Sequence, residues 1–191
     1  SEKLDIDKII FFDSEGNDHF PLFELCWDNN PVSPNFFEFI RKNPNLQYLS
    51  LNGCFTAPID DPSMANSEAL LSALPSLTNL RTIQLQGQGS QYNNKETINR
   101  LLFGLKFVQS LESINISGNK LTDEGVQLIT ELISVSTNLK VLKFDDLSFK
   151  SKNSILQIID AAESNRNIQP LQLLFPSFTI EELVKSDELN D

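Results

Sequence analysis

The sequence predicts an α/β solenoid, in which short parallel strands line a concave face and helices form the convex face. Six segments repeat one spacing of apolar residues, and their starts lie 26 to 34 residues apart. After several of these segments the pattern changes from strand-like alternation to the spacing of an amphipathic helix. A single strand–helix unit cannot bury its own apolar side, so neighbouring units must stack on one another.

The repeated spacing is L-x-x-L-x-L, with other aliphatic residues or phenylalanine allowed. The second and third apolar positions flank one polar residue, which is typical of a short strand with one buried face. The clear copies are Leu46-Leu49-Leu51, Leu80-Ile83-Leu85, Leu111-Ile114-Ile116 and Leu139-Leu142-Phe144. The weaker copies are Phe20-Phe23-Leu25 and Ile168-Leu171-Leu173.

Helices are predicted between the strands. Ser33 and Pro34 indicate a helix start, and the segment from Arg41 to Pro44 indicates its end. Thr179 and Glu182 have the spacing of a capping box for a final helix. The expected buried stripes of two further helices are Val126, Ile129, Leu132 and Ile133, and Ile155, Leu156, Ile158 and Ile159.

The copy at 111–125 resembles a leucine-rich repeat, because Asn119, Leu121 and Gly125 follow its apolar core at the family's positions. The long period and helical second halves resemble the ribonuclease-inhibitor type of this family. The resemblance covers residues 20–176. At the position that the family fills with Asn or Cys the six copies hold Asp28, Cys54, Gln88, Asn119, Leu147 and Pro176.

Three parts are expected along the chain. Residues 1–19 form a hairpin-like N-terminal cap, residues 20–176 an array of about six repeats, and residues 177–191 a capping helix with an acidic tail. The sequence begins at Ser1, and its single methionine is Met64. We therefore expect a monomer or a part of a longer protein.

The amino-acid composition argues against several classes of protein. A net charge of −11 argues against nucleic-acid binding, and no apolar run is long enough to span a membrane. Two cysteines are too few for a disulfide framework and favour a reducing, cytoplasmic location. Residues 1–28 hold eight acids against two bases, and residues 181–191 five against one. These acidic ends either keep the fold soluble or attract a basic partner.

No catalytic chemistry is indicated. His19 is the single histidine and falls in the expected cap turn, while Cys26 and Cys54 are isolated. Metal sites need clustered ligands, and acid–base chemistry needs carboxyl groups in contrasting environments. We therefore predict a protein that is not an enzyme, with no catalytic residue, no metal and no cofactor.

The concave face is the predicted binding surface, because solenoids commonly bind through it. Two columns of side chains are expected there: Glu24, Ser50, Gln84, Asn115, Lys143 and Gln172; then Cys26, Asn52, Gln86, Ser117, Asp145 and Leu174. Long connections at 55–66 and 86–94 are expected at one edge. The predicted partner-binding residues are Trp27, Tyr48, Asn52, Gln84, Gln86, Tyr92, Asn115, Ser117, Lys143 and Asp145. The alternatives are packing roles for Trp27 and Tyr48, tolerated insertions, and polar residues that are merely solvated.

The sequence thus predicts a non-catalytic module that binds another protein through this horseshoe. By the resemblance, such repeats occur in enzyme inhibitors, GTPase-activating proteins, immune sensors and bacterial effectors. The alternative hypothesis is a GTPase-activating or other regulatory scaffold that resembles the activator of Ran.

Overall fold

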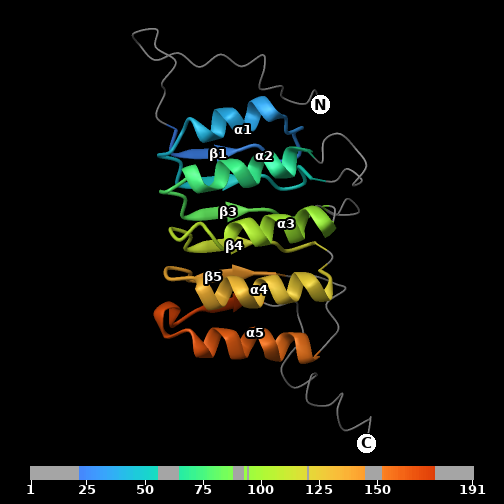
Figure 1. Ribbon diagram of the computed structural model, residues 1–191, viewed down its shortest axis with the longest axis vertical. Coiled ribbons are helices and arrows are strands. Elements are labelled where there is room, and N and C mark those ends of the chain that lie inside the picture. Colours follow the sequence, from blue (N-terminus) through green and yellow to red (C-terminus); the bar gives the residue numbers. More distant parts are fainter. Residues whose placement is uncertain are drawn as a thin grey trace, which may run out of the picture.

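In the described part of the chain six strands form one parallel sheet, in which each strand pairs with the next along the chain (Figure 1). The computed structural model describes residues 22–55, 65–87, 93, 95–119, 121–144 and 152–174. Within them the predicted α/β solenoid is confirmed. The predicted caps at 1–19 and 177–191, and most of both long connections, lie outside the described residues. The strands are β1 (Glu24–Cys26), β2 (Tyr48–Ser50), β3 (Thr82–Gln84), β4 (Ser113–Asn115), β5 (Val141–Lys143) and β6 (Gln172–Leu174).

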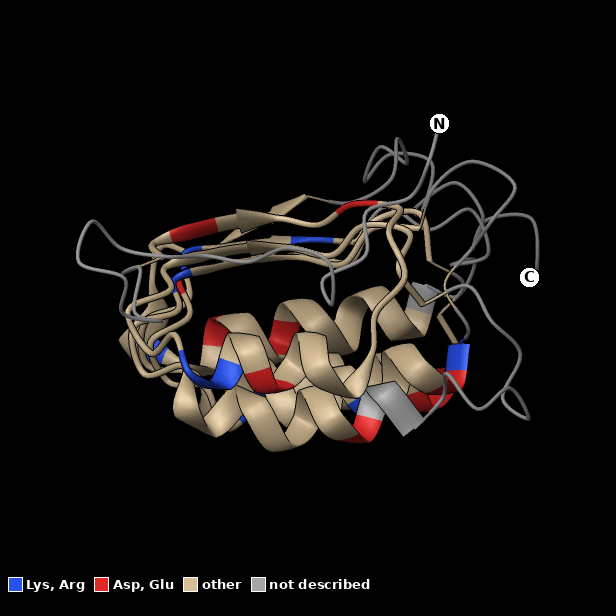
Figure 2. Cartoon of the chain, turned by 90° about the horizontal axis from the view of Figure 1, so that it is seen from above, with Lys and Arg blue, Asp and Glu red and all other residues tan. Residues whose placement is uncertain are grey.

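The helices form a second layer on one face of the sheet (Figure 2). Because all strands are parallel, each connecting segment carries the chain back to the same edge, and its helix lies beside the preceding one. Among the described residues no helix is long and apolar enough to cross a lipid bilayer. The helices are α1 (Pro34–Arg41), α2 (Ala65–Ala73), α3 (Lys95–Leu105), α4 (Asp123–Val135) and α5 (Lys152–Ser164), with single 3-10 turns η3 (Leu74–Ser76) and η4 (Arg166–Ile168).

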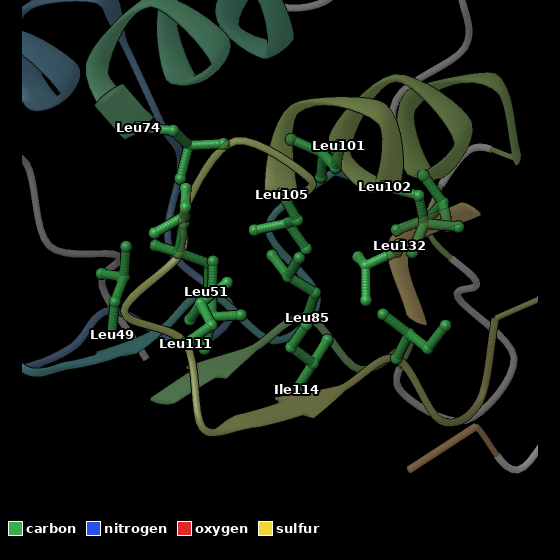
Figure 3. Packing of buried hydrophobic residues seen from close by; sticks show 14 of the residues in the cluster. Leu49, Leu51, Leu74, Leu85, Leu101, Leu102, Leu105, Leu111, Ile114 and Leu132 are labelled. Carbon is green, nitrogen blue, oxygen red and sulfur yellow. The ribbon is translucent and has the colours of Figure 1, made fainter. Parts of the chain in front are cut away.

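The core fills the space between the two layers. Figure 3 shows leucines from strand segments, such as Leu49 and Leu85, facing leucines from the helices, such as Leu105 and Leu132. The middle apolar position of each repeat forms a continuous column because neighbouring strands pair in register. This column contains Leu25, Leu49, Ile83, Ile114, Leu142 and Leu173.

The predicted helix signals are largely confirmed. Ser33 caps α1, since its side chain accepts a hydrogen bond from the Phe36 amide, and Pro34 opens the helix. All four apolar residues predicted for the α4 stripe are buried. The α5 stripe was predicted incorrectly at Leu156, which is exposed, whereas Ile155 and Ile158 are buried. Four apolar residues in five positions span more than one helix face, and one of them must point outward.

The register of the first and last copies differs from the predicted one by two residues. Leu25 pairs with Leu49, and Leu173 pairs with Leu142. The first copy is therefore Leu22-Leu25-Trp27 rather than Phe20-Phe23-Leu25, and Leu173 takes the middle position of the last copy. A shift of two residues keeps each side chain on the same face of a strand, because side chains alternate with period two. The predicted alternation of buried and exposed residues is therefore retained. In the first and last repeats, however, each column contains the residue two positions later than predicted.

A left-handed turn follows three of the strands at one register position. Asn29, Gly53 and Gly118 have positive φ values of 59°, 66° and 72°. Gly118 also lies against Gly87 of the previous repeat, where an added Cβ would meet the Gly87 carbonyl oxygen at 2.7 Å. Glycine is therefore required at Gly118 both for backbone conformation and for close stacking of repeats.

Truncation of Leu142 tests the stacked core. Leu142 is fully buried in the central column, so Leu142→Ala should lower the free energy of unfolding by about 2–5 kcal/mol through lost burial and a residual cavity. Leu156→Ala is the matched control, because this leucine is exposed on α5. Urea unfolding measures both variants. Equal losses in the two variants would contradict the assignment of Leu142 to the core.

Candidate functional site

The face of the sheet opposite the helices carries three columns of side chains, here called the concave surface. The paired strand residues fix the first two columns, and the residues that follow each strand give the third. The first column is Glu24, Tyr48, Thr82, Ser113, Val141 and Gln172. The second is Cys26, Ser50, Gln84, Asn115, Lys143 and Leu174. The described part of the third is Asp28, Asn52, Gln86 and Ser117.

Five predicted site residues have partly exposed side chains on this surface: Tyr48, Gln84, Gln86, Ser117 and Lys143. Sequence reasoning missed the middle of the first column, where Thr82, Ser113 and Val141 are also partly exposed. The period of two along a strand places them beside Gln84, Asn115 and Lys143. Two predicted residues, Tyr92 and Asp145, lie outside the described residues.

Asn52 and Asn115 differ from the prediction because both are buried. The Asn52 side chain donates to Asp28 Oδ2 at 3.1 Å and to Ser50 Oγ at 3.0 Å, and its Oδ1 accepts from the Gln86 amide at 2.7 Å. Asn115 Oδ1 accepts from the Ser117 amide at 3.1 Å. The Asn52 side chain therefore uses its hydrogen bonds to join the first three repeats, while Asn115 uses its Oδ1 to brace the turn that follows β4.

Asp28 is the centre of this polar network. Its carboxylate accepts from Ser50 Oγ at 2.6 Å, from the Asn52 amide at 2.9 Å and from Asn52 Nδ2. The repeat spacing in the sequence placed Asp28 at the family's Asn or Cys position. The corrected register moves that position to Asn30 and leaves Asp28 on the concave surface, where it ties the first repeat to the second.

Trp27 was predicted incorrectly as a partner-binding residue. In the corrected register it takes the third apolar position of the first copy, and its side chain is only 3% exposed. The indole stacks on Phe36 of α1 with ring centroids 5.0 Å apart, and Nε1 donates to the Pro31 carbonyl at 2.8 Å. The apolar ring is therefore packed inside the protein, and its N–H group has a hydrogen-bond acceptor there.

A ladder of polar side chains lies behind the concave surface. Asn119 Nδ2 donates to the Leu85 carbonyl at 2.8 Å and to the Ile116 carbonyl at 2.7 Å, and Cys54 Sγ lies 3.3 Å from the Trp27 carbonyl. In the third repeat Asn93 takes this role, because its side chain bonds the Leu85 carbonyl and the Phe55 amide. Sequence spacing had pointed to Gln88, since the longer connection displaces the functional asparagine by five residues.

Charge on the concave surface is polarised along the sheet. Glu24 and Asp28 lie at the β1 end, and Lys143 is the single cation in the described parts of the three columns. β1 and β5 are four strand spacings apart, which corresponds to about 19 Å. Between them lie hydroxyl and amide side chains that can both donate and accept hydrogen bonds.

A second charged row runs along the edge where the strands begin. Lys140 Nζ lies 2.6 Å from Glu112 Oε2, and Arg81 lies 4.0 Å from the other carboxylate oxygen. The hydrogen bond from Lys140, supported by both positive charges, holds the pKa of Glu112 below its usual value. A groove of about 520 Å³ continues from this edge onto the first column, lined by Val141 and Gln172 among others.

The described residues offer no site for metal-assisted chemistry, since no group of three or more His, Cys, Asp or Glu side chains comes together among them. His19 lies outside this part of the chain. The geometry of the concave surface is suited to hydrogen bonding with a polypeptide.

Removal of the Asp28 carboxylate tests the polar network. Asp28→Ala should lower the free energy of unfolding by about 1–3 kcal/mol, because it leaves buried donors of Ser50 and Asn52 unpaired. Glu24→Ala is the matched control, since Glu24 is an exposed acid in the same repeat, at the start of β1. Chemical denaturation of both variants gives the comparison. A loss at Asp28 no larger than that at Glu24 would show that the network adds no stability.

Titration of Tyr48 tests its environment. Burial raises the pKa of Tyr48, the hydrogen bond with Ser50 partly opposes this, and the nearby Cys26 and Asp28 add to the increase. Because the folded pKa is raised, the stabilising effect is complete below the unfolded pKa and is lost as pH rises through the folded value. In a Tyr92→Phe variant, phenolate absorbance should show Tyr48 ionising above the ordinary tyrosine value of about 10. Ionisation at the same pH in native and urea-unfolded protein would contradict this environment.

Comparisons with known proteins agree with the fold. A family model described as leucine-rich repeat matches residues 109–129. The tropomodulin C-terminal domain of Caenorhabditis elegans matches with a TM-score of 0.57 at 17% identity, over 89% of this chain and 90% of that one. Leiomodin-1 actin-binding site 2 matches with a TM-score of 0.59 at 13% identity, over 81% of this chain and 90% of that one.

The chain is also 30% identical over 152 residues to the Rho GTPase-activating protein gacW of Dictyostelium discoideum. The match covers 78% of this chain but only 13% of that protein. Sheet order, repeat spacing, the family match and the structural neighbours agree with one another. The chain therefore has the α/β solenoid fold of leucine-rich repeats, and residues 109–129 match the leucine-rich repeat family model.

Proposed function

We propose that this solenoid is a non-catalytic protein-interaction module and that its concave surface holds the partner polypeptide. The observation that carries the proposal is the one-sided helix layer: the described helices cover one face of the sheet and leave the other open (Figure 2). The open face presents partly exposed hydroxyl and amide side chains, including Thr82, Gln84 and Ser113. A polypeptide offers the matching donors and acceptors along its whole backbone.

The charge polarity of the concave surface supports a defined orientation of the partner. Glu24 and Asp28 favour positive charge at the β1 end, and Lys143 favours negative charge at the β5 end. The Asp28 network fixes the backbone beneath the first two repeats, so little ordering is needed on binding. A partner segment that crosses the strands would place a basic group near β1 and an acidic group near β5.

A GTPase-activating scaffold is the second candidate, and the name of the Dictyostelium relative favours it. The chain spans only 13% of that protein, so the relative's activity need not lie in the matched part. Arginine, the side chain that often stabilises charge in GTP hydrolysis, is absent from the described parts of the three concave columns. A hydrolysis assay with a panel of small GTPases separates the candidates. Strong stimulation by this chain would overturn the non-catalytic proposal.

The proposal also includes the subtype of the repeat and the cellular location of the protein. The helices α3, α4 and α5 between successive strands support the ribonuclease-inhibitor-like type of repeat. The two free cysteines, Cys26 and Cys54, support a reducing, cytoplasmic setting.

One structural neighbour is named as an actin-binding site. Co-sedimentation with actin filaments is therefore a suitable binding test with a defined protein.

Affinity capture with matched variants tests the binding surface. Gln84→Arg places a long cation in the middle of the concave surface and should abolish capture of specific proteins from lysate, detected by mass spectrometry. Gln157→Arg makes the same change on an exposed position of α5 and should retain capture. Both variants change surface residues, so their thermal midpoints should stay within about 2 °C of the parent. Retention of the same captured proteins by Gln84→Arg would show that the concave surface is not the site.

A further inference from the structure

An apolar patch lies on the helix layer, on the opposite side of the molecule from the concave surface. It consists of Phe103, Phe107 and Val135, which are 49%, 63% and 48% exposed. Phe103 and Phe107 contact each other edge to face, with ring centroids 5.5 Å apart. A contiguous group of large exposed apolar side chains commonly marks an interaction site.

The patch borders a groove at the carboxyl ends of α3 and α4. The groove has a volume of about 450 Å³, and its lining includes Phe107, Thr130, Glu131 and Val135. α3 and α4 pack side by side, so the groove follows the valley between two neighbouring helices. A third helix can lay an apolar ridge into such a valley, as in ordinary helix packing.

Exposed acids outnumber exposed bases around the patch: Arg100 is paired with Glu68 at 3.2 Å, and Arg166 follows α5. Lys106 lines the groove, and its Nζ lies 4.3 Å from the centroid of the Phe103 ring. Its side chain is 13% exposed and is already paired with Glu131 at 2.6 Å. Glu131 remains 51% exposed. On α5, Asp160 and Glu163 are exposed and form no ion pair within the described part of the chain.

These acids lie on α5, which packs against α4, the helix that lines one side of the groove. Asn165, which follows α5, donates to the carbonyls of Ser134 and Ser136, the two residues that flank Val135. The last turns of α3, α4 and α5 contain no basic residue. The partial negative charge of helix carboxyl ends therefore adds to that of the carboxylates.

We propose that this groove is a second docking site and that its occupant is a basic amphipathic helix of a partner protein. Apolar side chains of the helix would cover Phe103, Phe107 and Val135, while lysine or arginine would pair with Glu131, Asp160 and Glu163. A second copy of this chain fits less well, because two molecules of net charge −11 repel each other. The site is independent of the concave surface and gives the module two partner-binding faces.

Labelled peptides test the proposal by fluorescence anisotropy. The probe is a helical peptide of about 18 residues, or five turns, with leucines on one face and lysines on the other. A matched peptide replaces the lysines with glutamates. We expect the lysine peptide to bind at least about tenfold more tightly than the glutamate peptide, and Phe107→Ser to weaken its binding about tenfold or more.

Three further variants distinguish binding in this groove from binding elsewhere on the molecule. Phe23→Ser changes a phenylalanine of similar exposure that precedes β1 and should leave affinity unchanged. Gln84→Arg adds a cation to the concave surface, which would repel a lysine peptide bound there, and should also leave affinity unchanged. Glu163→Lys should weaken the lysine peptide without loss of thermal stability.

Specific outcomes would overturn the proposal. If the peptide is held only by attraction to the acidic ends of the chain, its affinity will be equal for the parent and for Phe107→Ser, and the proposal is wrong. Loss of binding in Gln84→Arg assigns the peptide to the concave surface instead. A concentration-dependent dimer that disappears in Phe107→Ser, observed by analytical ultracentrifugation, identifies a second copy as the occupant.

Discussion

The structure depends on stacking between units that are too small to be stable separately. Each strand has three residues. Its inward apolar side chain is buried in β2 to β5, which have a repeat on both sides, and only partly buried in β1 and β6 at the ends of the sheet. The same stacking aligns backbone groups: the amide of Leu51 donates to the Gln84 carbonyl, and that of Leu85 to the Asn115 carbonyl. Burial and hydrogen bonding therefore fix one register together, and that register determines which side chains reach the concave surface.

Polar residues perform two separate tasks in this arrangement. Buried ones such as Asn52, Asn93 and Asn119 bond backbone groups at the turns that follow the strands, where neither strand nor helix satisfies them. Partly exposed ones such as Gln84 and Lys143 project from the paired strands and remain available to a partner. The buried group stabilises repeats that differ in length, and the partly exposed group makes the concave surface suitable for binding a partner.

The repeat could be predicted from the sequence because burial imposes a strict period on apolar residues. The site was harder to predict. Residues 20–27 offer two overlapping matches to the same spacing, and only the pairing of Leu25 with Leu49 distinguishes them. That shift turned a core residue, Trp27, into a predicted surface anchor. Asn52 and Asn115 lie on the predicted face, but their side chains form hydrogen bonds within the protein. Such bonds depend on distances between atoms, which the spacing of residues in the sequence does not show. The exposure of Phe103 was not predicted, because this residue stands in one apolar run with the buried Leu101, Leu102 and Leu105.

Native-state hydrogen exchange tests the central claim, that neighbouring repeats hold each strand in place. The amides of Leu51, Leu85 and Ile116 each donate to a carbonyl of the next repeat, on Gln84, Asn115 and Lys143 respectively. If stacking is cooperative, these three amides should exchange with one common free energy, close to that of global unfolding. Rapid exchange of any one of them, while the other two stay protected, would show that the repeats open independently and would contradict the account.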